Sequence, residues 1–417
     1  MNKNKTPKLP NDREIIFNVL CSVLLDGRFS NETLRHVKSE HMPFITECVY
    51  GVVERKVTLD YIFKSVSKLP DKKVDDKVRV LLFMGIYELC YTKSKDYAVI
   101  YETVEIAKKH FHVGAVKFIN GILRQIQRTK CELIEEINNL SPQVKYSVSY
   151  EFYALLKEEY SDTEIEKMLV QSLKSPNVHI YVRRNIEKIE NTLKENKVNY
   201  EKKDDFLILE GFNYDILRNY LNYGDAAILD YSTSAVRDAL NHIGNKKIET
   251  VIDLCAAPGG KTLLISDYLN APKIVSQDIN NKRVELLTKN LQKWRLNNAI
   301  SKLADATNYE GGSYDLVICD VPCTGSGVIK RRPELKYKID KKAVEQLNVI
   351  QKKILMVANK YVEEDGYIIY STCSILKYEN EAILEYAKSA LGLNVVWCKY
   401  MDIDDLHEGF FVSLLKR

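Results

Sequence analysis

The chain has 417 residues, and its 61 Lys and Arg side chains against 57 Asp and Glu give a formal net charge of +4. This length allows two or three domains that each bury a core without disulfides or a structural metal. No run reaches the roughly 18 apolar residues of a membrane span, and no secretory signal pattern opens the sequence, so we expect a cytoplasmic protein. The small positive charge permits a nucleic-acid partner without requiring one.

The nine cysteines are scattered, and none belongs to a paired CxxC framework. This pattern predicts neither a zinc site nor structural disulfides. In a reducing compartment most cysteines are small buried hydrophobic residues, so a reactive one must be identified from its surroundings.

Helical periodicity dominates residues 1–130, with apolar residues recurring every three to four positions from Asp12 to about Lys130. This pattern predicts an all-α bundle. Its last helix is expected over roughly Ala115–Arg128, with one face that carries the basic residues Lys117, Arg124 and Arg128. We interpret this face as a candidate contact for RNA phosphates, although a solvated basic face is the more common meaning.

Residues 131–223 are expected to form connecting helices followed by a small α+β module. The apolar runs Val178–Val182 and Phe206–Leu209 predict strands, and Ile186–Asn196 predicts a helix between them.

From residue 224 to residue 417 strands and helices alternate, which predicts a doubly wound, mainly parallel sheet of the Rossmann-like class. The expected elements are strands at Glu249–Leu254, Ile274–Gln277, Tyr314–Cys319 and Gly366–Tyr370, with helices at Thr262–Leu269 and Arg283–Trp294.

The segment Val251–Thr262 is an apolar strand, a small-residue turn and the start of a helix. In an open α/β sheet such a turn meets a nucleotide-like ligand, and its glycines allow close backbone approach. The turn is neither GxGxxG nor GxxxxGKS/T, which argues against NAD and against a phosphate-binding ATPase loop. Asp278, at the end of the second strand, could accept hydrogen bonds from two ribose hydroxyls. Asp305, near the end of a probable third strand, could bond an adenine amino group. Each acid alone is equally consistent with a cap or turn residue.

Polar turns that contain cysteine follow two later strands. One turn holds Asp320 and Cys323, and the other holds Cys373. Because the carboxyl ends of parallel strands meet at one edge, we expect these three side chains to converge beside the cofactor. Cys255 and Cys319 are placed inside apolar strands and are expected to be inert.

A thiol and a carboxyl group in one crevice suit methylation of carbon 5 of cytosine. That carbon is too electron-poor to attack a methyl donor until a thiolate adds to carbon 6. A second group then assists loss of the carbon 5 proton, and Asp320 near nitrogen 3 can stabilise charge if it is protonated at that moment. The residues alone leave open which cysteine attacks.

At these residues the chain resembles the NOL1/NOP2/Sun family of RNA cytosine-C5 methyltransferases. The resemblance covers roughly Tyr200–Arg417 and is carried by DLCAAPGGKT, DVPCTGSGVIKRRPELKY, STCS and HEGFFVSLLKR. Further upstream FMGIYEL, AVIYETVEIAK and FINGILR resemble the NusB-like domain of a bacterial branch of the family. The resemblance implies S-adenosylmethionine as cofactor and small-subunit (16S) ribosomal RNA as substrate. Because the target base must be unstacked, we expect that RNA to be free or partly assembled. We also expect a monomer without a metal.

The resemblance also assigns roles. It implies that Cys373 is the nucleophile, that Cys323 assists release, and that Lys261 and Asp320 complete the catalytic set. The cofactor site is expected to consist of Cys255, Ala256, Ala257, Pro258, Gly259, Gly260, Lys261, Asp278, Arg283, Asp305 and Asp320. Arg331 and Arg332 are expected to contact RNA phosphates. The family's usual Gln-Asp pair appears here as Leu229-Asp230, which leaves the role of Asp230 open.

Two alternatives remain at this stage. In the first, the enzyme methylates a transfer RNA or another position of ribosomal RNA, because the same motifs occur in the family members that act on those substrates. The second is a non-catalytic RNA-binding assembly factor, against which the intact Asp320, Cys323 and Cys373 argue. Any such enzyme needs an unstacked base, which favours a loop, bulge or unfolded stretch of RNA.

Overall fold

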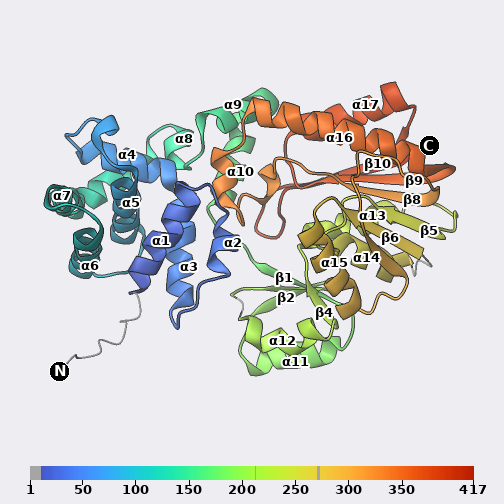
Figure 1. Ribbon diagram of the computed structural model, residues 1–417, viewed down its shortest axis with the longest axis horizontal. Coiled ribbons are helices and arrows are strands. Elements are labelled where there is room, and N and C mark those ends of the chain that lie inside the picture. Colours follow the sequence, from blue (N-terminus) through green and yellow to red (C-terminus); the bar gives the residue numbers. More distant parts are fainter. Residues whose placement is uncertain (1–10, 212, 270–272) are drawn as a thin grey trace. The chain divides into compact units, whose positions relative to one another are not determined.

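The computed structural model describes residues 11–211, 213–269 and 273–417, which divide into two compact units (Figure 1). The helical unit comprises the described residues up to Ala154 together with the short segment Arg332–Lys338. The sheet unit comprises residues 155–331 and 339–417.

The helical unit is all α, as the periodicity predicted. Its helices are α1 Asp12–Leu24, α2 Ser30–Leu34, α3 Met42–Glu54, α4 Lys56–Val66, α5 Asp76–Tyr91, α6 Asp96–His110, α7 Val113–Asn138, α8 Pro142–Lys145 and the start of α9 Tyr150–Glu159. Ile16, Leu20 and Leu123 are among the fully buried apolar side chains of its core. Helix α7 runs further than predicted at both ends, because His112 caps it by accepting a bond from the Ala115 N–H and no Gly or Pro interrupts it after Gly121.

The segment Arg332–Lys338 belongs to the helical unit although in sequence it lies between two parts of the sheet unit. The Glu334 carboxylate is buried and accepts a 3.0 Å hydrogen bond from the Ser30 N–H. Lys336 is fully buried, and its ammonium donates to the Tyr146 carbonyl at 3.4 Å. Two charged side chains therefore have their partners in the helices, and a fragment that lacks the helical unit would leave both without them.

A four-stranded antiparallel sheet forms the small α+β module, which confirms that part of the predicted fold. Its strands are β1 Val178–Val182, β2 Tyr200–Lys203, β3 Phe206–Leu209 and β4 Ala226–Ile228, in the order β2-β3-β1-β4. Helix α10 (Asp162–Ser172) precedes it, and α11 (Ile186–Glu195) and α12 (Tyr214–Asn222) bury Leu193 and Leu217 against Ile180 and Leu207. The sequence missed β2 and β4, because one is a run of polar residues and the other has only three residues.

The second sheet has seven strands and is mainly parallel, as predicted. The strands are β5 Thr250–Asp253, β6 Lys273–Asp278, β7 Ala299–Leu303, β8 Tyr314–Asp320, β9 Val362–Thr372, β10 Asn394–Met401 and β11 Phe410–Lys416. Their order is β10-β11-β9-β8-β5-β6-β7, in which β11 pairs antiparallel with both β9 and β10. The carboxyl ends of β5, β6, β8 and β9 therefore share one edge.

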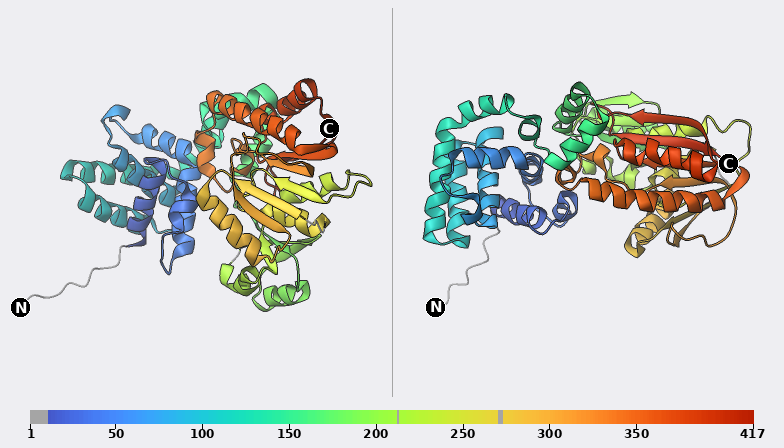
Figure 2. Two further views of the ribbon diagram at one scale, coloured as in Figure 1. Left: turned by 45° about the vertical axis from the view of Figure 1, so that its right-hand side comes forward. Right: turned by 90° about the horizontal axis from the view of Figure 1, so that it is seen from above.

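Helices cover both faces of this sheet (Figure 2). They are α13 Ala235–Leu240, α14 Gly260–Leu269, α15 Asn281–Lys293, α16 Lys341–Tyr361 and α17 Glu381–Leu391. On one face α16 and α17 pack Leu355 and Ile383 against the strands, and on the other α13 and α14 pack Val236 and Ile265. The two layers leave the polar carboxyl edge of the sheet as the place for a ligand.

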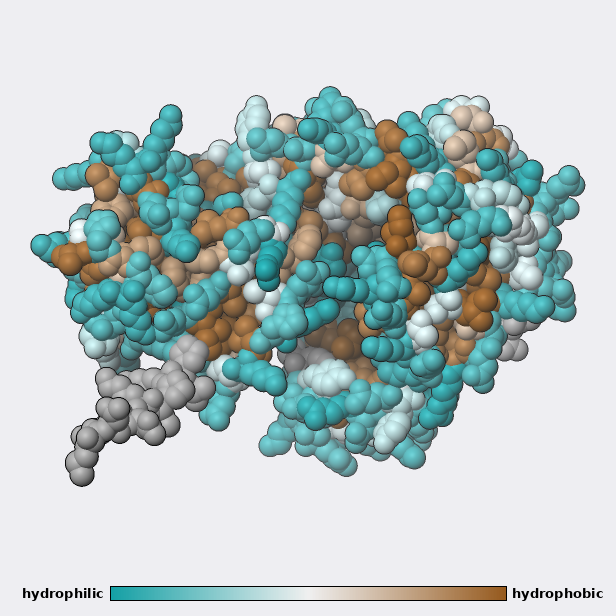
Figure 3. All heavy atoms as spheres, viewed as in Figure 1, coloured by the Kyte–Doolittle hydropathy of each residue, from teal (hydrophilic) through white to brown (hydrophobic). Residues whose placement is uncertain are grey.

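Among the described residues no helix is long and apolar enough to cross a membrane. Hydrophilic residues occupy most of the visible face of each unit, with hydrophobic residues in scattered patches (Figure 3).

Candidate active site

Close packing explains the glycines of the turn after β5. Gly259 has φ +107°, which disfavours any other residue, and an added Cβ there would lie 2.8 Å from Leu287 Cδ1. A Cβ on Gly260 would lie 2.6 Å from Leu229 Cδ2. The turn thus brings bare backbone to the carboxyl edge, where an adenosyl group can approach it.

Two buried acids, Asp253 at the end of β5 and Asp278 at the end of β6, each have an oxygen atom without a hydrogen bond in the described chain. Asp253 Oδ2 accepts a 2.8 Å bond from Thr262, whereas Oδ1 has no hydrogen-bond partner among the described residues. Burial raises the pKa of Asp253 to about 7. Asp278 Oδ1 accepts from the Asn280 N–H, and its Oδ2 makes no hydrogen bond within the described chain, although Arg283 Nη2 lies 3.3 Å away. A ribose has two hydroxyl donors, and the open Asp278 oxygen fits one of them.

Asp305 lies two residues beyond β7, near the predicted place. Its Oδ1 accepts hydrogen bonds from the Thr307 N–H and hydroxyl, each at 2.8 Å, and Oδ2 accepts from Asn308 Nδ2 at 3.3 Å. The carboxylate thus closes its own turn. The contact with adenine stays a prediction.

The two cysteines that follow β8 and β9 meet at the sheet edge. Cys323 Sγ lies 3.2 Å from Cys373 Sγ, and both residues are partly accessible. The loops that carry them are joined by a 3.0 Å bond from the Gly327 N–H to the Cys373 carbonyl. The two cysteine side chains therefore converge as expected, with their sulfur atoms in contact.

Two other cysteines lie close by in sequence. Cys319 is buried inside β8, as predicted, whereas Cys255 lies in the turn after β5, and its placement within a strand was wrong. β5 ends at Asp253 because the chain turns there toward α14. Burial raises the pKa of both thiols, which disfavours the reactive thiolate form.

Lys261 and Asp320 form an ion pair beside the cysteines, with Lys261 Nζ 2.6 Å from Asp320 Oδ2. Burial alone would lower the pKa of Lys261, but the Asp320 carboxylate raises it above its usual value. Asp320 Oδ1 accepts a 3.1 Å bond from the Ser371 hydroxyl. The first turn of α14 and the end of β8 are thus tied together at the catalytic edge.

The surroundings distinguish the two thiols. The hydrogen bond between them lowers the pKa of Cys373 and raises that of Cys323, as expected if Cys323 donates its S–H. The Lys261 ammonium also lowers the pKa of Cys373. These surroundings lower the pKa of the Cys373 thiol relative to that of Cys323, and attack by Cys373 stays a prediction.

Arg331 lies in an internal ionic network. Its guanidinium is 3.0 Å from Asp230 Oδ2 and 3.0 Å from Glu408 Oε1, and it donates to the Asn177 carbonyl. His179 Nδ1 lies 3.2 Å from the same Asp230 oxygen. These contacts link the small module, the catalytic loop and the segment before β11, and they give Asp230 a structural partner.

The other residues expected to contact RNA are placed differently. Arg332 lies in the segment that belongs to the helical unit, with its guanidinium 5.6 Å from the centre of the Phe29 ring. Lys117, Arg124 and Arg128 are exposed on α7. RNA contact by any of these residues, and by Arg331, stays a prediction.

Glu408 is expected to make the stability of the sheet unit depend on pH. Burial raises its pKa to about 7, whereas an unfolded glutamate titrates near pH ~4.3. Between these values the folded chain binds more protons than the unfolded chain, so stability falls as pH rises through this window. In Glu408→Gln, the difference in unfolding free energy between the two ends of this pH window should become smaller by about 1 to 3 kcal/mol.

Urea unfolding measured at about pH 5 and about pH 8 checks this expectation. The matched control is Glu385→Gln on the exposed side of α17, which should keep the wild-type slope. An unchanged slope in Glu408→Gln would contradict the expected role of this carboxyl group.

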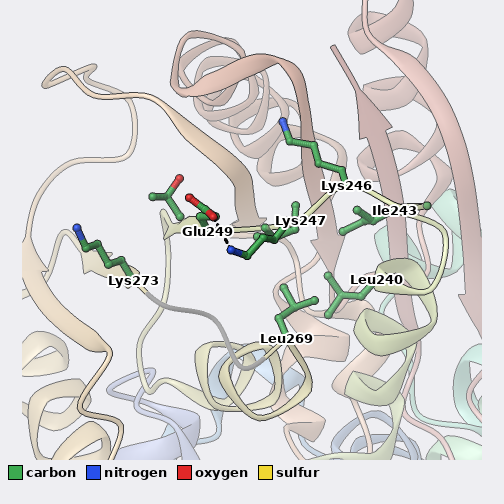
Figure 4. A pocket seen from close by; sticks show the side chains of 10 residues that line it. Leu240, Ile243, Lys246, Lys247, Glu249, Leu269 and Lys273 are labelled. Carbon is green, nitrogen blue, oxygen red and sulfur yellow. Dashed lines mark ion pairs between the residues drawn. The ribbon is translucent and has the colours of Figure 1, made fainter.

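A separate pocket of about 650 Å³ lies at the opposite edge of the sheet, near the starts of β5 and β6 (Figure 4). Two of the lysines that line it are paired, Lys247 with Glu249 at 2.7 Å and Lys246 with Asp315 at 3.4 Å. None of the predicted site residues lines it. This pocket is therefore separate from the candidate site at the carboxyl edge of the sheet.

The sequence interpretation missed Glu379 and Asn380, which lie just beyond the second cysteine loop. Both side chains are fully buried. The available signal was a charged and an amide residue together in the otherwise ordinary start of a helix, shortly after Cys373. Such a signal is weak without the tertiary contacts. In the part of the chain that the structure describes, no group of three or more His, Cys, Asp or Glu is placed to hold a metal ion.

A mainly parallel sheet with a glycine turn after β5 and buried acids at successive strand ends defines an S-adenosylmethionine-dependent methyltransferase of the Rossmann-like class. Two family models match the chain: 16S rRNA methyltransferase RsmB/F over residues 241–399, and the NusB family over residues 10–128. The chain belongs to the RsmB/F methyltransferase family and carries a NusB-like domain.

Relatives extend the match over most of the chain. The probable ribosomal RNA small subunit methyltransferase B of Bacillus subtilis is 30% identical over 405 residues, which cover 89% of this chain and 87% of that protein. Ribosomal RNA small subunit methyltransferase B of Photorhabdus laumondii is 28% identical and covers 89% of this chain and 88% of its own length.

Solved structures share the fold. The crystal structure of PH0851 superimposes with a TM-score of 0.78 at 21% identity and covers 99% of this chain and 100% of that one. The structure of NSun6 from Pyrococcus horikoshii with SFG has a TM-score of 0.57 at 17% identity and covers 64% of this chain and 98% of that one.

Proposed function

We propose that this methyltransferase modifies carbon 5 of a cytosine in 16S ribosomal RNA through a covalent adduct with Cys373. The observation that carries the proposal is the 3.2 Å approach of Cys323 and Cys373 beside the Lys261–Asp320 ion pair. The substrate follows from the relatives named small subunit methyltransferase B and from the match to the RsmB/F family. Ribosomal RNA also suits the cytoplasmic location expected from the sequence.

The fit of the cofactor rests on the open oxygen of Asp278 and on the glycine turn that follows β5. Asp278 would hold the ribose, and Gly259 and Gly260 would let the backbone contact the methionine part of the cofactor. S-adenosylmethionine, when bound, supplies an electrophilic methyl group. Arg283 would position Asp278, from which it is separated by 3.3 Å.

The reaction begins at Cys373. Its thiolate forms a bond to carbon 6 of the cytosine, and the electron pair of the carbon 5–carbon 6 double bond moves toward nitrogen 3. Lys261 and Asp320 lie together at this edge and would stabilise that charge and transfer a proton to nitrogen 3. Carbon 5 thereby becomes nucleophilic and is methylated.

Release requires removal of the carbon 5 proton. We assign assistance in this step to Cys323, whose sulfur lies beside that of Cys373. The electron pair of the broken C–H bond restores the double bond, and the Cys373 thiolate leaves carbon 6. Two cysteines at contact distance therefore have one role in each half of the reaction.

The RNA is expected to be free or partly assembled, because the target base must leave its stack to reach a thiol at a sheet edge. The helical unit, with its exposed basic residues on α7, would bind the phosphate backbone. We propose that the whole protein acts as a monomer and without a metal.

A methyl-transfer assay tests this function. The full chain is incubated with labelled methyl donor and 16S ribosomal RNA from cells that lack the enzyme, and the modified nucleotide is mapped. We expect one 5-methylcytosine at one position of 16S ribosomal RNA, and more transfer to free RNA than to complete subunits. Transfer RNA and large-subunit RNA serve as matched substrates.

Two results would overturn the proposal. Preferential methylation of transfer RNA or large-subunit RNA would show that 16S ribosomal RNA is not the substrate. Tight binding of 16S ribosomal RNA without methylation of any RNA would favour an assembly factor that has kept the fold.

A further inference from the structure

The carboxylate of Glu379 joins the two cysteine loops. Its Oε1 accepts hydrogen bonds from the Thr324 N–H at 2.9 Å and from Gln351 Nε2 at 3.0 Å. Its Oε2 accepts from the Thr324 hydroxyl at 2.5 Å and from the Ser374 hydroxyl at 2.6 Å. Thr324 directly follows Cys323, and Ser374 directly follows Cys373, so one carboxylate binds the neighbours of both thiols.

Asn380 continues this arrangement on one side. Its amide oxygen accepts a 2.6 Å bond from the Thr372 hydroxyl, and its amide nitrogen donates to the Ser374 carbonyl at 3.0 Å. The two contacts lie on either side of Cys373. The side chain therefore fixes the backbone that carries this cysteine.

The chemistry of the bridge is unusual for a core. Glu379 is fully buried, and the four donors that reach it are neutral amide and hydroxyl groups. Burial of a carboxylate is costly, and here four donors to one group offset that cost. A residue that only filled space could be apolar. A residue that must hold two separate loops in one register needs several directed bonds.

We propose that Glu379 is a positioning residue that holds Cys323 and Cys373 at their working separation, and that Asn380 orients Cys373 for attack. Neither side chain reaches the sulfur atoms by hydrogen bonds; both act through Thr324, Ser374 and Thr372. The proposed role in catalysis rests on the two-cysteine reaction described above, whereas the effect on the distance between the two sulfur atoms does not depend on it.

Thiol trapping measures that distance without RNA or cofactor. Diamide takes two hydrogens from a pair of neighbouring thiols and is reduced to its hydrazine as the disulfide forms. The rate at which the Cys323–Cys373 disulfide appears is followed in the full chain by mass spectrometry after alkylation of the remaining thiols. Glu379→Ala is expected to slow this rate about 10-fold or more, because misplacement of reacting groups by about 1 Å costs up to ~10²-fold in rate.

Glu379→Gln provides the conservative variant. Its amide oxygen can still accept from the Thr324 N–H and from Gln351, and its amide nitrogen can donate to the two hydroxyls. Trapping should therefore recover most of the wild-type rate. Glu385→Ala, an exposed glutamate on α17, should trap at the wild-type rate.

Methylation kinetics give the second measurement. Glu379→Ala should lower kcat about 10²-fold while KM for the cofactor stays within about twofold, since the bridge lies at the cysteine loops and not at Asp278. Cofactor binding by calorimetry verifies folding of each variant. If Glu379→Ala does not fold, Thr324→Val and Ser374→Ala each remove one hydroxyl from Oε2, and the double variant should slow trapping more than either one.

The outcomes separate the two proposals. Slower trapping in Glu379→Ala supports the positioning role even if the wild type methylates no RNA, a result that would count only against the proposed function. A folded Glu379→Ala chain that traps at the wild-type rate would overturn the positioning role, whatever the methylation assay shows.

Discussion

Cys373→Ala is expected to abolish methylation and covalent attachment to RNA together. The hydrogen bond with Cys323 and the Lys261 ammonium both lower the pKa of this thiol. Without a thiolate to add at carbon 6, carbon 5 stays electron-poor, and the rate should fall at least ~10⁴-fold. Denaturing gels with labelled RNA measure the adduct, and label transfer measures methylation.

Cys323→Ala is expected to give the opposite adduct result. Attack by Cys373 and methylation remain possible, but assistance in loss of the carbon 5 proton is removed, so a stable protein–RNA adduct should accumulate. Cys398→Ala, an exposed cysteine on β10, is the matched control and should behave as wild type. An adduct trapped by Cys373→Ala and absent from Cys323→Ala would reverse our assignment of the two cysteines.

The second large effect is expected from Gly327→Ala, where two backbone segments touch. A Cβ at Gly327 would lie 1.9 Å from the Gly409 carbonyl oxygen, and Gly327 also bonds to the Cys373 carbonyl and to the Gly409 N–H. Backbone cannot give way as the end of a side chain can. We expect a loss of about 3 kcal/mol or more in the unfolding free energy of the sheet unit.

Tryptophan fluorescence makes this measurement specific. The two tryptophans of the chain, Trp294 and Trp397, both belong to the sheet unit. In urea their transition should move to lower concentration in Gly327→Ala.

Gly121→Ala serves as the control of opposite sign. This glycine lies on the exposed face of α7, and an added Cβ meets nothing within 4 Å. The helical unit should gain about 1 kcal/mol, visible by circular dichroism, while the tryptophan transition stays at its wild-type midpoint. A wild-type midpoint in Gly327→Ala would show that the two loops can separate without cost.

The buried segment Arg332–Lys338 affects how the units can be studied. Glu334 and Lys336 find their partners within the helical unit, although the chain reaches them directly from the catalytic loop. A truncated sheet unit would therefore carry two charged side chains without those partners.

The sequence by itself determined the fold class and predicted which residues lie at the carboxyl edge of the sheet. Apolar periodicity separates the helical region from the alternating strands and helices, because the two periods, 3.6 and 2, are local properties. The placement of Asp278, Asp320, Cys323 and Cys373 also followed from local order, since the carboxyl ends of parallel strands must share an edge.

Only the tertiary structure decided which groups touch. Cys323 and Cys373 lie 3.2 Å apart, and the Lys261 ammonium lowers the pKa of Cys373, whereas burial raises that of Cys323; residue types alone do not predict these surroundings. Arg331, assigned by sequence to RNA, has internal partners in Asp230 and Glu408. Asp230 is 101 residues and Glu408 is 77 residues away from Arg331 along the chain, so no local sequence pattern could predict these contacts.

The same reason explains why Glu379 escaped notice. Its four hydrogen bonds join segments separated by up to 55 residues, and its sequence neighbours are those of an ordinary helix start. Local propensity predicts the elements that a chain forms. Which polar groups are buried together is decided by the packing of those elements, because each must find its hydrogen-bond partner once water is excluded.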